Sequence, residues 1–188
     1  MMRLPAVLLA LLAVSGCSGC SPGFAPGPGE VSSLQEAGGR DERLGEVSAL
    51  TGCQEHGGLP DPRCTPGAVR AGVSLQEICR YGYSRSVRPP ESYTEALKLR
   101  QMSAYGFAGS PGEYEEDHLV ALSIGGSPND PANLWPEPRS GPNSAEEKDQ
   151  LESWAARMAC SRRVPLSALQ RGMAKDWVAL KGQAVAPR

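Results

Sequence analysis

The sequence has few of the features on which several large classes of protein depend. Aromatic residues make up only 5% of its 188 residues, with two Phe and three Trp, so any hydrophobic core is modest. From Thr65 onward 15 Lys and Arg stand against 14 Asp and Glu, a balance that neither favours nor excludes a polyanionic partner. The four cysteines from Cys53 to Cys160 include no C-x-x-C pair, which argues against zinc.

The one long apolar run stands at the N-terminus, in "MMRLPAVLLALLAVSGC", and ends by about Val14. It is too short to span a bilayer and has the build of a secretory signal. Residues 14–17, Val-Ser-Gly-Cys, fit a bacterial lipobox, so we predict that residues 1–16 are removed and that Cys17 carries lipid. Simple secretion with cleavage nearby is the alternative. Either way the protein is expected to be exported, and the lipid would anchor it to a membrane of the cell envelope.

Residues 17–64 are rich in Gly, Pro, Ser and charge and contain few large apolar residues. Such a segment buries too little surface to offset its chain entropy, so we interpret it as a tether, with a short helix open at "ERLGEVSAL". Residues 65–188 then form one small domain.

Six cysteines in an exported chain favour disulfide bonds over free thiols. A lipid on Cys17 leaves five, of which Cys20 lies in the tether and is the odd one out. The other four have more than one possible pairing, and we favour the one in which two of them flank the predicted core. The favoured pairs are Cys53 with Cys64 and Cys79 with Cys160.

Capping boxes and periodicity predict three helices in this domain. Ser92-x-x-Glu95 predicts a helix through about Ala104 that ends at Gly106. Ser144-x-x-Glu147 predicts a second helix, with apolar residues at i, i+3, i+4 and i+7. These are Leu151, Trp154, Ala155 and Met158. A last helix begins near Pro165 and is expected to pack on the second, although a partner groove is also open. Its apolar face comprises Leu166, Leu169, Met173, Trp177 and Leu180.

Between the first two helices the pattern predicts a hairpin. "HLVALSI", residues 118–124, reads as a strand, Gly125-Gly126 and "SPNDPA" form its loop, and "NLWPEP", residues 133–138, is the return strand. The predicted fold class is therefore α+β.

This hairpin carries the main candidates for chemistry. The chain has two histidines, and His56 falls in the tether, so a catalytic histidine would be His118. An imidazole is a competent base near neutral pH, and the neighbouring carboxylate of Asp117 is suited to grip a divalent cation. Asn133 follows His118 by fifteen residues and would lie across the hairpin, where its amide can fix the imidazole tautomer.

The order Asp-His, apolar strand, Gly-Gly, loop, Asn-Leu and helix resembles the ββα-metal finger of HNH endonucleases. More narrowly, "VRPPESYT", "QMSAYG", "YEEDHLVAL", "GGSPNDPANLWPEP" and "KDQLE" resemble exported bacterial HNH-like proteins, over about residues 65–181. The resemblance implies that His118 is the general base, that Asn133 orients it, and that Asp117 binds the metal. HNH helices usually supply a His or Asn as the second ligand; here Asn143 is the preferred candidate, with Asp149 behind it.

Other residues near the hairpin are candidates for contact with nucleic acid. Arg139, Lys148 and Asp149 are the helix-side candidates for phosphate or site contacts, and solvated surface charge is the alternative for each. Arg88, Lys98 and Arg100 are further cationic candidates. Trp135 would either stack on a base or fill the core.

Two functions from different classes follow. The first is phosphodiester hydrolysis by an exported, membrane-tethered nuclease that uses Mg²⁺ or Mn²⁺ and acts on DNA rather than RNA, with no small-molecule cofactor. The second is a non-catalytic envelope lipoprotein in which the finger serves as a structural or binding module. A chelator distinguishes the two, because only the nuclease would lose a function with its metal.

Overall fold

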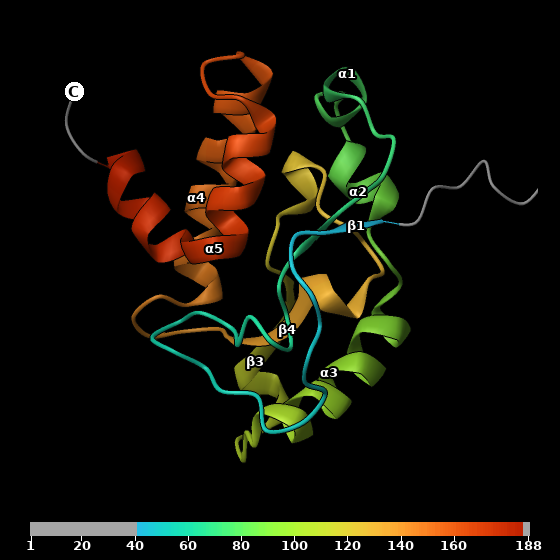
Figure 1. Cartoon of the computed structure of the whole chain (residues 1–188), viewed down its shortest axis with the longest axis vertical. Coiled ribbons are helices and arrows are strands. Elements are labelled where there is room, and N and C mark those ends of the chain that lie inside the picture. The colour runs from blue at the N-terminus through green and yellow to red at the C-terminus, as the bar shows by residue number, and fades with distance from the viewer. Residues whose placement is uncertain (1–40, 186–188) are drawn as a thin grey trace, which may run out of the picture. The chain divides into compact units, whose positions relative to one another are not determined.

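The computed structural model describes residues 41–185, and these form a mixed α+β structure with two small antiparallel sheets (Figure 1). The predicted signal peptide, the lipid site at Cys17 and the assignment of Cys20 lie outside the described residues. The strands are β1 (Glu42–Arg43), β2 (Ala68–Val69), β3 (Tyr114–His118) and β4 (Leu134–Pro138). The helices are α1 (Leu75–Ile78), α2 (Tyr83–Val87), α3 (Glu91–Tyr105), α4 (Ala145–Cys160) and α5 (Leu166–Val185).

β3 and β4 form the predicted hairpin, but its first strand lies earlier than the sequence pattern indicated. β3 pairs with β4 so that Asp117 faces Trp135 and His118 faces Leu134, and the strand ends at His118. The apolar residues 119–121 leave the sheet and enter the core, followed by a 3-10 turn at Leu122–Ile124. The prediction of a strand over residues 118–124 was therefore wrong, because this apolar run is buried by helices and not by strand pairing.

The loop between the strands packs tightly against the chain that enters it. A Cβ added at Gly126 would lie 1.7 Å from the carbonyl oxygen of Val120, so a side chain has no room there. The sequence placed Gly125-Gly126 correctly in the loop, and this close approach explains the need for the second glycine.

The helix limits agree with the predictions, although the caps do not. α3 ends at Gly106, which adopts a left-handed conformation with φ 68°. Pro90 and Ser144 occupy the N-cap positions of α3 and α4, and neither provides a side-chain capping bond. The two predicted capping boxes are therefore not formed. Glu147 instead accepts a hydrogen bond from the backbone N–H of Asn143, at 3.2 Å.

α4 and α5 lie side by side and enclose the main core with the loop after β3 (Figure 1). The predicted apolar face of the last helix is confirmed for Leu169, Met173 and Trp177, which are buried. The helical backbone of α5 is interrupted at Asp176. The buried members of this core are Val69, Leu119, Val120, Ala121, Ile124, Leu151, Ala155, Ala159, Leu169, Met173 and Trp177.

Residues 41–64, which we assigned to the tether, pack on the domain. β1 pairs with β2, and no helix forms over residues 42–50. Asp61 is 2% exposed and accepts hydrogen bonds from the backbone of Gln54 and from Arg63. The folded part therefore begins before Thr65. A disulfide and a buried, hydrogen-bonded carboxylate stabilise this segment, which contains little apolar surface.

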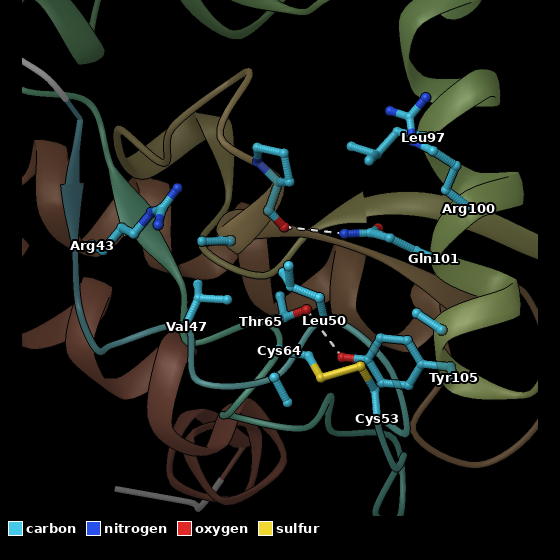
Figure 2. Close-up of a pocket in the computed structure, with 14 residues that line it drawn as sticks. Arg43, Val47, Leu50, Cys53, Cys64, Thr65, Leu97, Arg100, Gln101 and Tyr105 are labelled. Atoms are coloured by element: carbon cyan, nitrogen blue, oxygen red, sulfur yellow. Dashed lines mark hydrogen bonds between the residues drawn. A yellow bond between two sulfur atoms is a disulfide. The ribbon is translucent and has the colours of Figure 1, made fainter.

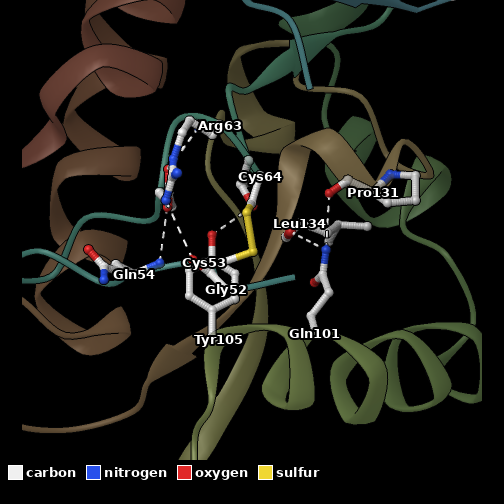
Figure 3. Close-up of a disulfide and its surroundings, with 11 residues drawn as sticks. Gly52, Cys53, Gln54, Arg63, Cys64, Gln101, Tyr105, Pro131 and Leu134 are labelled. Carbon is white, nitrogen blue, oxygen red and sulfur yellow. Dashed lines mark hydrogen bonds and ion pairs between the residues drawn. A yellow bond between two sulfur atoms is a disulfide. The ribbon is translucent and has the colours of Figure 1, made fainter. Parts of the chain in front are cut away.

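Both predicted disulfides are present, Cys53 with Cys64 and Cys79 with Cys160. The first lies against Tyr105 (Figure 3), and the second joins the end of α1 to the last residue of α4. Disulfides of this kind are consistent with an exported protein. None of the described helices has both the length and the apolar character needed to cross a membrane.

Candidate functional site

His118 is the last residue of β3, and its imidazole is held in one tautomer. The side chain is 3% exposed, and Nε2 lies 3.1 Å from the carbonyl oxygen of Pro128. A carbonyl oxygen only accepts hydrogen bonds, so Nε2 carries the proton and Nδ1 keeps its lone pair. Nδ1 has no hydrogen-bond partner among the described residues and is not fully enclosed by protein.

Burial lowers the pKa of His118, and the nearby negative charge of Asp117 only partly opposes this shift. The imidazole is therefore neutral at neutral pH. A neutral imidazole with a fixed Nε2–H and an accessible Nδ1 lone pair is the form that a general base requires.

Asn133 does not contact this imidazole, contrary to the prediction. Its Oδ1 accepts from the backbone N–H groups of Val120 (2.9 Å) and Ala68 (3.2 Å). Its Nδ2 donates to the carbonyls of Val120 (3.0 Å) and Ser127 (2.9 Å). Asn133 therefore fixes the loop that ends beside Pro128, and the Pro128 carbonyl holds the tautomer.

Lys148 reaches from α4 to the end of β3 and is the centre of an ionic cluster. Its side chain is 1% exposed. Nζ donates to Asp117 Oδ2 at 2.5 Å, to Glu152 Oε1 at 2.6 Å and to the backbone carbonyl of His118 at 2.8 Å. An ammonium group has three N–H donors, and all three are used here. Lys148, a predicted phosphate contact, thus has no donor left for phosphate.

The charges of this cluster are strongly coupled. Burial alone would raise the pKa of Asp117, but the charge of Lys148 and the side-chain hydrogen bonds from Glu137 and Lys148 together outweigh it and hold that pKa at about 2. Burial raises the pKa of Glu152 to about 7 and that of Glu137 well above its ordinary value. Burial opposes the charge of Lys148, yet Asp117 and Glu152 together raise its pKa well above normal. At neutral pH the ammonium of Lys148 therefore faces the full carboxylate of Asp117 and a partly protonated Glu152.

The two predicted metal ligands are not brought together. The side chain of Asn143 donates to the carbonyl of Gly57 and accepts from Lys181 Nζ, each at 3.0 Å, whereas Asp117 is bound by Lys148. No group of three or more His, Cys, Asp or Glu in the described part of the chain is arranged to hold a metal ion. The residues present do not fit a divalent cation between Asp117 and Asn143.

The remaining candidates lie around this cluster with different roles. Arg139 is exposed and pairs with Glu115 at 2.8 Å. Asp149 is exposed on α4, next to Lys148 but not part of its ion pairs. Trp135 is fully buried, with its ring centroid 5.9 Å from that of Tyr105, and so belongs to the core.

Arg88 follows α2 directly and is exposed. Its positive charge acts on the pKa of His118. Burial is the main influence on the pKa values of His118, Asp149 and Glu115, and the charge of Arg88 adds a smaller lowering contribution to each. Arg88 forms no ion pair among the described residues and so keeps its guanidinium available to an anion.

A separate cavity of about 440 Å³ lies between α3 and the segment that follows β1 (Figure 2). The disulfide Cys53–Cys64 lies at one side of it, close to the 3.0 Å hydrogen bond between Thr65 and Tyr105. Its lining includes none of Asp117, His118 and Lys148, so it is not part of the His118 site.

No protein-family model, curated protein or solved structure matches this chain.

Sequence reasoning missed the partners that shape this site. Pro128, Glu137 and Glu152 were not among the expected site residues, and Lys148 was expected at phosphate and not inside an acidic cluster. The spacing of Lys148 and Glu152, four residues apart on a helix, was the available signal, because such pairs meet on one helix face.

Proposed function

We propose that β3, β4 and α4 form an HNH-like unit that hydrolyses phosphodiester bonds in nucleic acid outside the cytoplasm, with His118 as general base. The observation that carries the proposal is the fixed tautomer of His118, whose Nε2–H is held by Pro128 while Nδ1 stays accessible. The order of hairpin and helix and the sequence resemblance support it. The disulfides support a site of action in an oxidising compartment.

The reaction is a displacement at phosphorus. His118 Nδ1 takes a proton from a water molecule as the water oxygen attacks the phosphorus atom. The bond from phosphorus to the leaving oxygen breaks, and that oxygen takes a proton from solvent. Arg88 would bind the phosphate, because it is an exposed guanidinium whose charge acts on His118. Lys148 binds the carboxylate of Asp117, so the step uses only residues of this chain and water.

The second function is a non-catalytic module, and one observation favours it. His118 is only 3% exposed, so a substrate has a small opening through which to reach Nδ1. A module of this kind would keep the hairpin for its stability and would cut no nucleic acid.

The test is cleavage of supercoiled plasmid and of single-stranded RNA by the purified, oxidised protein, with chelator, with Mg²⁺ and with Mn²⁺. The decisive variant is His118→Ala, and the matched control is His56→Ala, which removes the only other histidine from an exposed loop. We expect cleavage by the wild type and by His56→Ala, and a loss of at least about 100-fold in His118→Ala. Circular dichroism confirms that both variants are folded.

Equal cleavage by His118→Ala would show that another residue or a contaminant does the chemistry. If no protein cuts either nucleic acid under any condition, the non-catalytic reading replaces this one.

A further inference from the structure

The three oxygen atoms around Lys148 Nζ are the kind that a hard divalent cation prefers. Two are carboxylate oxygens, from Asp117 and Glu152, and the third is the backbone carbonyl of His118, all within 2.8 Å of the nitrogen. Glu137 adds a further buried carboxyl group, which lies against Asp117. Without the ammonium, these groups would form an oxygen-lined cation site.

We propose that the side chain of Lys148 takes the place of the divalent cation, so that this site is built and works without a metal ion. The ammonium fixes the carboxylate of Asp117 and the carbonyl of His118, which are adjacent on β3. It thereby holds the backbone that carries the catalytic imidazole. Lys148 is thus a positioning residue. The inference rests on the proposed function for its activity readout, although its metal-binding readout stands alone.

Charge explains why a divalent cation cannot simply join the ammonium. Lys148 is fully buried, so two cations in contact there would repel one another with little screening by water. Oxygens of Asp117 and Glu152 already accept from Lys148 Nζ at 2.5 and 2.6 Å, and the carbonyl of His118 accepts at 2.8 Å. The oxygens that a dication would need are therefore occupied by the ammonium.

The substitution Lys148→Ala should convert the cluster into a metal site. It removes the ammonium, leaves its volume vacant and frees the oxygens of Asp117 and Glu152. Lys175→Ala is the matched control, because Lys175 is exposed on α5.

The experiment follows free Mn²⁺ by electron paramagnetic resonance in a titration of chelator-treated, dialysed protein at pH 7.5. We expect wild type and Lys175→Ala to bind no Mn²⁺ below millimolar concentrations. Lys148→Ala should bind at least tenfold more tightly and lose that binding when Asp117→Asn is added. Should Lys148→Ala be unfolded without metal, refolding by Mn²⁺ but not by an equal ionic strength of NaCl is the expected sign of the new site.

Wild-type protein that binds Mn²⁺ below millimolar concentrations, and loses it in Asp117→Asn, would overturn the inference. So would a folded Lys148→Ala protein that gains no Mn²⁺ binding, or an unfolded one that Mn²⁺ does not refold. In the activity arm, cleavage unchanged by chelator supports the inference, and cleavage that needs added metal contradicts it. If nothing is cleaved at all, the proposed function fails. The Mn²⁺ titration of the wild type still tests whether Lys148 takes the place of a divalent cation.

Discussion

Strand β3 meets a buried lysine at each of its two ends, and the two arrangements differ in the carboxylates that the lysines bind. At the first end Lys98 of α3 donates to the carbonyl of Tyr114 at 3.4 Å and to Glu95 at 2.8 Å. At the other end Lys148 of α4 donates to the carbonyl of His118 and to Glu152. Each lysine thus binds a strand carbonyl and a glutamate of its own helix.

Only Lys148 also binds a carboxylate of the strand. Asp117 gives it a third, buried partner, whereas Glu116, on the Lys98 side, has two carboxyl oxygens without a hydrogen-bond partner among the described residues. Glu95 is half exposed, whereas Glu152 is only 20% exposed. A buried ammonium becomes the centre of a site when its carboxylates are also removed from water, because only then is each charge dependent on the others.

The largest loss of stability is expected on removal of the Cys79–Cys160 disulfide, which anchors α4 but not α3. Cys79 and Cys160 are 81 residues apart, whereas Cys53 and Cys64 are 11 apart. In the chain-entropy model these loops correspond to about 4.5 and about 2.8 kcal/mol of stability. Urea unfolding of Cys79→Ala/Cys160→Ala and Cys53→Ala/Cys64→Ala should show the first pair to be the more destabilised. The reverse order would mean that α4 does not depend on its covalent anchor.

The second prediction removes the centre of the site. Lys148→Met leaves Asp117 buried without its counter-charge and should lower the free energy of unfolding by about 3–5 kcal/mol at pH 7. Adding Asp117→Asn should restore part of that loss, which a double-mutant cycle in urea measures. If the double variant is no more stable than Lys148→Met, the two charges are not coupled as described.

The third effect is expected at Glu116, a buried carboxyl group whose oxygens have no hydrogen-bond partner among the described residues. Burial raises the pKa of Glu116 from 4.5 to about 9. Because the folded-state pKa is above the unfolded one, its contribution to stability is fully present below about pH 4.5 and is lost as the pH rises toward 9. Glu116→Gln should therefore stabilise the protein at pH 8, on the order of 2 kcal/mol, and have less effect at pH 5.

Thermal unfolding at the two pH values measures the difference for Glu116→Gln. Glu146→Gln, an exposed position on α4, is the control and should show no such trend. A stabilisation by Glu116→Gln that is the same at both pH values would rule out ionisation as its cause.

The smallest effect is expected at the other lysine. Lys98→Met removes a weak carbonyl contact and an ion pair to half-exposed Glu95, so the loss should be about 1 kcal/mol in urea. A loss as large as that of Lys148→Met would erase the distinction between the two ends of β3.

The sequence predicted α3, α4 and α5 because their signals are local, whereas the disulfide pairs followed from the cysteines that flank the predicted core. Gly106 ends α3, and the apolar repeat of α5 places Leu169, Met173 and Trp177 in the core. The strand was misplaced because β3 reads Tyr-Glu-Glu-Asp-His, a charged stretch that is buried only through partners distant in sequence.

The candidate site was predictable only in part, because several of its contacts join residues that are distant in sequence. His118 and Asp117 were found from their neighbourhood in the chain, and Asn133 was placed in the right loop but given the wrong partner. The role of Lys148 depends on the angle at which α4 crosses the end of β3, and no local pattern encodes that angle. Asn143 failed as the second ligand because Gly57 and Lys181 bind it instead.

The central claim is that His118 is a neutral base whose proton resides on Nε2, and nitrogen-15 NMR of the imidazoles tests it most directly. The chain has only two histidines, so His118→Ala assigns the signals. We predict the Nε2–H tautomer at pH 7, with a pKa below 6.5 because the ring is buried. An Nδ1–H tautomer, or an imidazolium at pH 7, would show that His118 does not hold its proton on Nε2 as a neutral base.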